Sequence, residues 1–163
     1  MTELKPCPYE IHRLLPHEPP MLLLDEVSGW NADRIVTGVT VRPDSLFLDD
    51  KGMPAHIAIE WMAQACGAWV GVQALEAGQP VRIGFLLGTR DFNSRISRYR
   101  LGDRVAVTAS VVFNDGQMAV FDCTAARDAE VCATARLNVF QPADLDAMLK
   151  EQGVTMQRDS IRS

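Results

Sequence analysis

The sequence predicts an α+β fold in which an antiparallel β-sheet wraps around one long α-helix. Two observations predict it. Residues 53–71 ("MPAHIAIEWMAQACGAWVG") are apolar on nearly every face of a helix, and β-rich runs stand before and after them. The chain has 163 residues, of which 47% are hydrophobic. This is enough for one domain with a substantial core, which we expect to span residues 1–163.

The β-rich runs follow the chain in a simple order. They lie at 21–30, 34–41, 81–92, 104–113, 118–126 and 130–140. The first two flank the turn-like "NAD" and precede the helix, and the third follows the helix. The last three form a meander, because "NDG" and "RDAE" are typical of hairpin turns. Short helices are expected before His17 and after Pro142.

One stripe of the predicted helix is polar or small, unlike the rest. It consists of His56, Glu60, Ala63, Gln64, Gly67 and Gly71. Glycine in a helix costs about 1 kcal/mol relative to alanine, so two on one face indicate that another chain or a ligand approaches closely. The apolar remainder exceeds what one thin sheet covers, and we therefore expect a dimer.

Charge and cysteine spacing exclude several classes of protein. The polar stripe interrupts the apolar run that a membrane span needs, and "MTELKPCPYE" lacks the apolar core of a signal peptide, so we expect a cytoplasmic protein. The net charge of −5 argues against general nucleic-acid binding. The four cysteines include no C-x-x-C pair, so we expect free thiols and no metal; Cys123 and Cys132 are candidates for neighbours across a hairpin.

Several strings resemble known enzymes. "LLPHEPPMLLLDEV", "MPAHIAIEWMAQACG" and "GFLLGTRDFNSRISRYRLGDRV" stand in the order found in the hot-dog-fold 3-hydroxyacyl-acyl-carrier-protein dehydratases of the FabZ/FabA type. "RPDSLFL", "LPHEPPMLLLDEV", "GFLLGTR" and "ARLNVFQP" are more closely similar to the ApeP-type dehydratases of aryl polyene gene clusters. The resemblance implies active sites between the subunits of a homodimer or of a hetero-oligomer with a second dehydratase. It also implies a substrate on the phosphopantetheine of an acyl carrier protein, without a cofactor.

Dehydration of a 3-hydroxyacyl thioester needs a base for the C2 proton and an acid for the departing hydroxyl. Glu60 matches the family's helix carboxylate, and apolar surroundings would favour its protonated form; the alternative is a carboxylate paired with an arginine or serving as a cap. The family's loop histidine is missing from "DSLFLDDKGMP". The base is therefore His56, one turn before Glu60, or His17, which matches the "LPH" position usually read as structural. His56 is equally well interpreted as a helix cap.

Further residues are candidates for binding substrate. The backbone amides of Ala55, His56 and Ile57 open the helix and would face a thioester oxygen, and Gln64 lies on the same stripe as Glu60. Gly88 matches a strand glycine of the family and either lines the acyl tunnel or marks a bulge.

Five arginines, at positions 90, 95, 98, 100 and 104, gather near each other in the sequence. They form either a solvated strand edge or a dock in which Arg95 and Arg98 bind pantetheine phosphate or the acidic carrier protein. Three functions stay open. The chain is a dehydratase, which we favour, or a hot-dog thioesterase in which Glu60 activates water, or a non-catalytic subunit that pairs with an active dehydratase.

Overall fold

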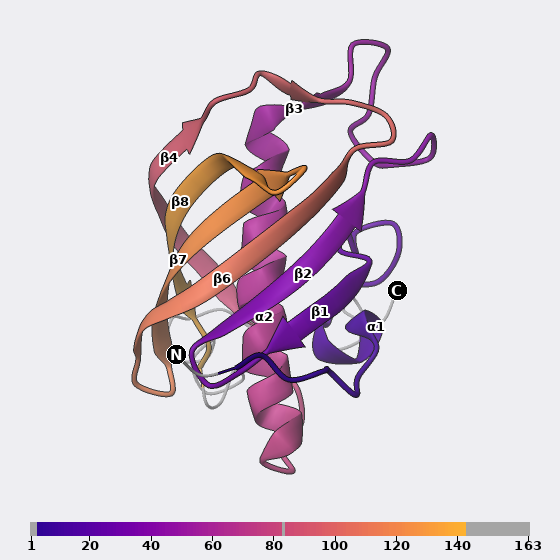
Figure 1. Cartoon of the computed structure of the whole chain (residues 1–163). Helices are drawn as coiled ribbons and strands as arrows, with labels where there is room; N and C mark the ends of the chain where they lie inside the picture. The colour runs from indigo at the N-terminus through magenta and orange to yellow at the C-terminus, as the bar shows by residue number, and fades with distance from the viewer. Residues whose placement is uncertain (1–2, 83, 143–163) are drawn as a thin grey trace, which may run out of the picture.

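The computed structural model describes residues 3–82 and 84–142 and shows a six-stranded antiparallel sheet packed against one long helix, α2 (Ala58–Glu76), with a separate two-stranded sheet beside them (Figure 1). The strand order is β1-β2-β6-β7-β8-β4. These strands are β1 Glu26–Trp30, β2 Arg34–Thr40, β4 Phe85–Ser94, β6 Arg104–Asn114, β7 Met118–Arg127 and β8 Glu130–Phe140. The predicted α+β class is confirmed, and each β-rich run contains a strand of this sheet.

Element boundaries differ from prediction where long-range contacts decide them. The run 21–30 becomes a strand only at Glu26, since the residues before it bond to α2 instead. The predicted helix starts later, because β3 (Met53–Pro54) pairs with β5 (Arg98–Tyr99) and a 3₁₀ turn, η1 (Ala55–Ile57), precedes α2. The short helix predicted before His17 is confirmed as α1 (Ile11–Leu14). The helix predicted after Pro142 lies outside the described residues.

The core lies between the sheet and the face of α2 turned toward it. Trp61 packs edge-on against Tyr99, with ring centroids 4.8 Å apart, and Trp69 packs against Phe121 at 5.7 Å. Inward residues alternate along the strands, as in β6, where Val105, Val107 and Ala109 are buried. This alternation is what a half-buried sheet requires.

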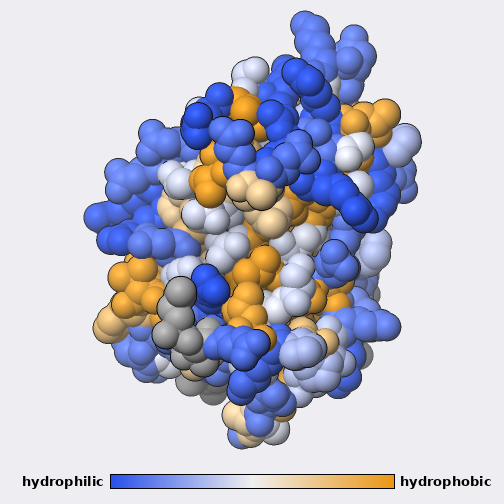
Figure 2. Space-filling model, viewed as in Figure 1, coloured by the Kyte–Doolittle hydropathy of each residue, from blue (hydrophilic) through white to orange (hydrophobic). Residues whose placement is uncertain are grey.

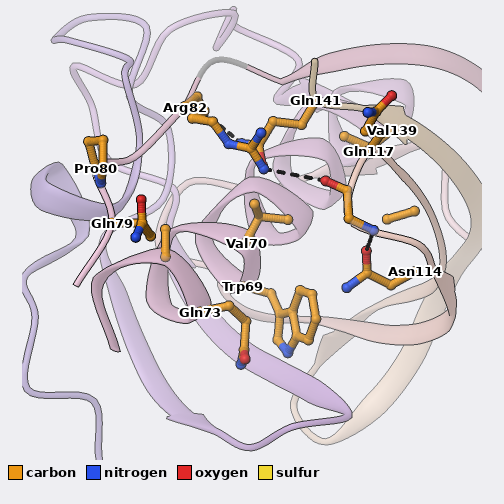
Figure 3. A pocket seen from close by; sticks show the side chains of 13 residues that line it. Trp69, Val70, Gln73, Gln79, Pro80, Arg82, Asn114, Gln117, Val139 and Gln141 are labelled. Carbon is orange, nitrogen blue, oxygen red and sulfur yellow. Dashed lines mark hydrogen bonds between the residues drawn. The ribbon is translucent and has the colours of Figure 1, made fainter. Parts of the chain in front are cut away.

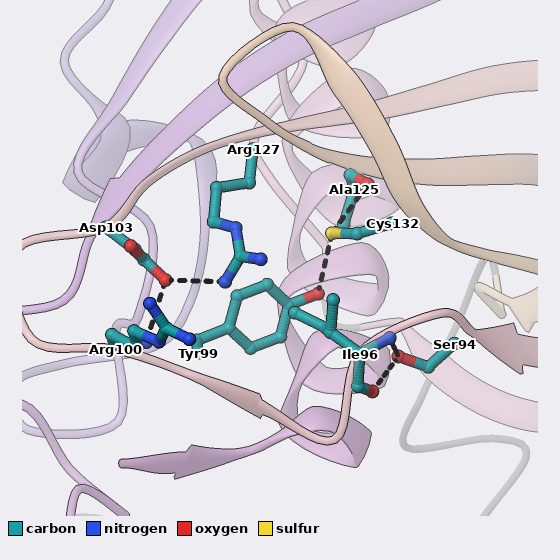
Figure 4. A network of polar contacts seen from close by, with 8 residues as sticks. All are labelled: Ser94, Ile96, Tyr99, Arg100, Asp103, Ala125, Arg127 and Cys132. Atoms are coloured by element: carbon teal, nitrogen blue, oxygen red, sulfur yellow. Dashed lines mark hydrogen bonds and ion pairs between the residues drawn. The ribbon is translucent and has the colours of Figure 1, made fainter.

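The cysteines are arranged differently from the prediction. Cys123 lies opposite Ala135 in the sheet, and its sulfur is 3.6 Å from that of Cys66 on α2. The thiol of Cys132 instead contacts the hydroxyl of Tyr99 at 3.5 Å and donates to the Ala125 carbonyl (Figure 4). The suggested neighbourhood of Cys123 and Cys132 is therefore wrong. All four cysteines are free thiols.

The glycines of the helix stripe admit a segment of the same chain. A Cβ on Gly71 would lie 2.3 Å from the Leu14 carbonyl oxygen, and one on Gly67 would lie 2.9 Å from the Leu15 side chain. The expected close approach is real, but another chain or a ligand is the wrong partner, because α1 and the residue after it fill the space. The stripe at these two glycines is thus covered from within the chain.

Apolar surface remains at the edge of the sheet. β4 is an edge strand, and its Phe85, Leu86 and Leu87 are 38%, 40% and 57% exposed. On the face seen in Figure 2, apolar residues form separate patches between hydrophilic ones. No helix within residues 3–82 and 84–142 is long and apolar enough to cross a bilayer.

Candidate functional site

The segment 14–24 folds over the face of α2 that is turned away from the sheet, and Gln64 holds it there. The Gln64 side chain is buried, with only 4% of the residue exposed. Its Oε1 accepts hydrogen bonds from the amides of Leu23 at 2.9 Å and Leu24 at 3.4 Å, and its Nε2 donates to the Met21 carbonyl at 2.7 Å. One side chain thus fastens the segment to the helix just after His17.

This arrangement brings His17 and Glu60 into one cavity of about 210 Å³. The helix contributes Glu60, the folded-over segment contributes His17, and the far wall comes from the strand ends. The cavity is lined by Leu14, Leu15, Pro16, His17, Glu60, Ala63, Gln64, Gly67, Val70, Arg82, Gly84, Leu86, Val139 and Gln141. The mixture of apolar wall and few polar groups is typical of a small-molecule site.

His17 and Glu60 influence each other without touching. Partial burial lowers the pKa of the His17 imidazole, and the negative charge of Glu60 acts in the opposite direction. Within the described residues the two side chains form no ion pair, and Glu60 has no hydrogen-bond partner. The predicted alternative of a Glu60 carboxylate paired with an arginine is therefore not observed. The imidazole and the carboxyl group both line the cavity, without a contact between them.

His56 lies apart from this pair. It is exposed in η1 and does not line the cavity of His17 and Glu60. No side chain caps η1, so the cap interpretation also lacks a contact. The Ala55 amide donates to the Ser97 carbonyl at 3.0 Å. The expectation that this amide is free for a thioester oxygen is wrong, because β5 and the residue before it come alongside the helix start.

Gln64 and Gly88 serve the fold more than the cavity. Gln64 lines the cavity, but its amide is occupied by the segment that it holds, so the expectation that it binds substrate gives way to a positioning role. Gly88 does not line this cavity. It lies at a register shift between β4 and β8, which favours the bulge interpretation over the acyl tunnel.

Part of the arginine cluster is neutralised by neighbouring acids. Arg95 pairs with Glu130 at 3.6 Å, and Arg98 pairs with Asp49 at 3.3 Å. Near them Arg127 pairs with Asp103 at 3.1 Å (Figure 4). Three arginines of the cluster form no ion pair within the described residues: Arg90, Arg100 and Arg104. The cluster keeps positive charge, but Arg95 and Arg98 contribute less of it than the sequence indicates.

Two polar residues of the cavity escaped the sequence analysis. Arg82 follows α2, and Gln141 follows β8; the Gln141 side chain donates to the Arg82 carbonyl at 2.9 Å. Gln141 belongs to the string "ARLNVFQP", which is a weak signal for it. Nothing in the local sequence marks Arg82, because its place depends on how the chain returns from α2 to the sheet.

Known proteins resemble this chain at both sequence and structure level. Residues 9–150 match the model of the ApeP-like family, described as ApeP dehydratase. The 3-hydroxyacyl-[acyl-carrier-protein] dehydratase FabZ of Rhizobium leguminosarum bv. trifolii is 32% identical over 138 residues, which cover 80% of this chain and 86% of that protein. The FabZ of Rhizobium etli is also 32% identical, with the same coverage.

Solved structures extend the comparison. A chain of the dehydratase heterocomplex ApeI:P from Xenorhabdus doucetiae superimposes with a TM-score of 0.82 and 30% identity, covering 86% of this chain and 95% of that one. A hypothetical thioesterase from Streptococcus pneumoniae, solved with coenzyme A, has a TM-score of 0.57 and 16% identity over 72% of this chain and 84% of that one. At that identity the likeness concerns the fold alone.

Proposed function

Since the chain belongs to the ApeP-like dehydratase family and has the hot-dog fold of a hydro-lyase, we propose that it dehydrates 3-hydroxyacyl thioesters carried on the phosphopantetheine of an acyl carrier protein. The product is the trans-2-enoyl thioester, formed in the cytoplasm during aryl polyene or fatty-acid-like biosynthesis. The observation that carries this proposal is the cavity shared by His17 and Glu60.

The two side chains divide the reaction between them. The neutral His17 imidazole takes the C2 proton, and the electron pair of that C–H bond forms the C2–C3 double bond. Glu60, in its protonated form, gives its proton to the departing C3 hydroxyl, which leaves as water. The open space between the two groups leaves room for C2 and C3. Protons then return from His17 to Glu60 through solvent, so no cofactor is required.

The surroundings of His17 in the cavity suit it to this role. A lowered pKa keeps the imidazole unprotonated at neutral pH and thus able to accept a proton. His56 does not line this cavity, which makes it the weaker candidate for the base. The proposal therefore moves the base from the position one turn before Glu60 to the segment that Gln64 holds against the helix.

A second subunit is proposed to complete the site. Leu86 lines the cavity and belongs to the edge strand β4, where it and its two apolar neighbours are exposed. An unpaired, apolar edge strand is a template for pairing with another chain. Pairing along β4 would cover these side chains and close one wall of the cavity. The second subunit is another copy of this chain or, as the heterocomplex relative suggests, a second dehydratase.

The need for a partner also favours a second candidate function. Glu60 and His17 are both exposed on the chain alone, so the cavity lacks the water-excluding wall of a finished active site. A subunit that shapes the tunnel of an active dehydratase, without turning over substrate itself, would show the same exposure. The dehydratase proposal is preferred because the base and the acid both come from this chain.

The test uses a 3-hydroxyacyl thioester on acyl carrier protein, with products followed by mass spectrometry. Enoyl thioester formed by the purified chain supports the proposal. Free acid and free thiol would indicate a thioesterase instead. If no product forms until a second dehydratase subunit is added, and inactivating Glu60 of this chain leaves that mixture fully active, the chain is the non-catalytic subunit.

A further inference from the structure

A second cavity lies beside the C-terminal half of α2, and the reaction proposed above gives it no task. It has a volume of about 510 Å³, which is typical of small-molecule sites. Figure 3 shows Arg82 and Gln141 on one side of this cavity and Trp69 on the other. We call it the Trp69 cavity, because Trp69 belongs to its wall and not to that of the cavity of His17 and Glu60.

The lining of the Trp69 cavity combines an apolar wall with one cation. Arg82 is the one charged residue among the described residues of the lining, and no aspartate or glutamate is among them. Four glutamines and an asparagine add neutral polar groups. A wall of this kind suits a ligand with an apolar body and a single negative charge. The apolar part of the wall consists of Trp69, Val70, Ala74, Pro80, Ala119 and Val139.

The Arg82 guanidinium has no acidic partner within residues 3–82 and 84–142. It donates to the carbonyls of Gly116 at 3.3 Å and Pro142 at 3.4 Å, and both distances exceed those of strong N–H···O hydrogen bonds. Arg127, which is also half-buried, pairs by contrast with Asp103 at 3.1 Å. Most N–H groups of the Arg82 guanidinium are therefore left for an anion from outside the chain.

The backbone of Arg82 is fixed although its side chain is weakly bound. The side chain of the buried Gln141 donates to the Arg82 carbonyl at 2.9 Å, and the backbone amide of Gln141 donates to the Gln117 carbonyl at 2.7 Å. These bonds tie the segment after α2 to the residue after β8 and to the turn between β6 and β7. The guanidinium is thus held out from an anchored backbone, which lowers the entropy cost of binding a ligand there.

We propose that the Trp69 cavity binds a free carboxylic acid with an apolar body and that Arg82 holds its carboxylate. A guanidinium matches the two oxygens of a carboxylate with two parallel hydrogen bonds, while the apolar wall covers the hydrocarbon part of the ligand. A phosphate dianion is the poorer match, because the described lining offers only one cation. The inference does not depend on the proposed function, since it concerns binding in another cavity.

The test measures, by calorimetry, the binding of two probes of nearly equal size, octanoate and octanamide. The unchanged chain should bind octanoate about tenfold more tightly or better, which is the effect of a hydrogen bond to a charged group. This preference should shrink as added salt screens the attraction. Equal affinity for the two probes, or no binding of octanoate, would overturn the inference.

A substitution of Arg82 assigns the preference to its guanidinium. Arg82→Gln should bring the affinity for octanoate down to that for octanamide, and the retained affinity for octanamide reports that the variant is folded. Arg90→Gln is the matched control, because Arg90 also forms no ion pair among the described residues and does not line the cavity. A preference for octanoate that survives Arg82→Gln contradicts the assignment.

Fluorescence locates the ligand. Trp69 lines the cavity, and neither of the other two tryptophans, Trp30 and Trp61, does so. Octanoate should therefore change the tryptophan emission of the unchanged chain, and Trp69→Phe should abolish this response while calorimetry still detects binding. If the unchanged chain shows no response, or if the response persists in Trp69→Phe, the ligand binds elsewhere and the inference fails.

Discussion

The two faces of α2 are packed in different ways, and the difference separates stability from chemistry. The apolar side of the helix is filled by large rings, with Trp69 on Phe121 of the six-stranded sheet and Trp61 on Tyr99 of β5. The opposite face carries Gly67 and Gly71 under α1, together with the polar Gln64 and Glu60. One face is a close-packed core, and the other is a hydrogen-bonded seat for the segment that bears His17.

The comparison teaches that an apolar helix need not be a uniform core element. Close packing tolerates little change in volume, whereas a face of small residues lets a backbone segment come near and places polar groups in reach of a ligand. Substitutions on the sheet face should therefore change the free energy of unfolding with little specific effect on turnover. Substitution of Glu60, on the opposite face, should do the reverse, whereas substitution of Gln64 should affect both quantities.

The largest effect is expected on the sheet face. Trp61→Ala removes a side chain that is only 1% exposed and leaves a cavity beside Tyr99. The free energy of unfolding should fall by about 3–5 kcal/mol, as measured by chemical denaturation. Ile59→Ala is the control on the same helix, because Ile59 is only half-buried and should cost less. Equal losses would mean that the two faces are not distinct in packing.

On the opposite face, Glu60→Gln tests the proton donor. The amide keeps the size and polarity of the carboxyl but has no transferable proton, so turnover should fall by roughly 10²-fold or more. Stability should hardly change, because Glu60 is exposed and makes no bond within the described residues. Glu76→Gln changes an exposed acid at the other end of α2 and should leave turnover intact. Full activity in Glu60→Gln would exclude the acid role.

The two histidines near this face can be separated by substitution. His17→Gln should reduce turnover by about 10²-fold or more, since it removes the base. His56→Gln should keep most of the activity, because His56 is exposed and outside the cavity. The opposite result would restore the base one turn before Glu60 and contradict our assignment.

The pH dependence sharpens the same assignment. Burial lowers the pKa of His17 in the folded chain, so the unfolded chain binds a proton more readily. His17 therefore lowers the free energy of unfolding as the pH falls through its unfolded pKa of about 6.5. The acid limb of kcat/KM should lie below that pH.

Periodicity and turn signals were sufficient for the sheet, the long helix and α1, because these depend on local sequence. They also placed Glu60 on a stripe of polar and small residues. These signals could not predict that His17 and Glu60 line the same cavity. It depends on hydrogen bonds between Gln64 and residues more than 40 positions earlier in the chain, and such contacts leave no periodic signal. Spacing along one helix pointed only to His56, since His17 lies in another segment.

The glycines show a similar limit. Gly67 and Gly71 indicated that something comes close to the helix, and this was confirmed, but the sequence did not show that the partner is Leu14 and Leu15 of the same chain. The boundary at Glu26 failed for a related reason, since the apolar run before it bonds to a side chain of α2 and not to a neighbouring strand. Local pattern indicates which residues are buried. Tertiary contacts determine which neighbours those residues pack against.

An intermediate effect is expected at Gln64, which joins the segment 14–24 to α2. Gln64→Met keeps the volume of the side chain but leaves the Leu23 amide and the Met21 carbonyl without their partner. This should lower the free energy of unfolding by about 1–3 kcal/mol and reduce turnover, since His17 is no longer held in place. Gln79→Met, at an exposed position, is the control. Unchanged turnover in Gln64→Met would show that Gln64 is not needed to position His17.

The smallest effect is expected far from both faces of α2, at the arginine cluster. Arg95 and Arg98 are surface residues whose ion pairs with Glu130 and Asp49 contribute at most about 1 kcal/mol to stability. We propose that these arginines attract the pantetheine phosphate or the acidic surface of the carrier protein, as the remaining positive charge of the cluster also does. The double variant Arg95→Ala with Arg98→Ala should then bind acyl carrier protein more weakly, and the loss should shrink as added salt screens the attraction. Because each arginine already has an acidic partner, we expect a loss of only a few-fold.

Arg34→Ala, in β2, serves as the control for loss of positive charge outside the cluster. If carrier affinity at low salt is the same in the double variant as in the unchanged chain, the cluster is a solvated edge of the sheet and the carrier protein docks elsewhere.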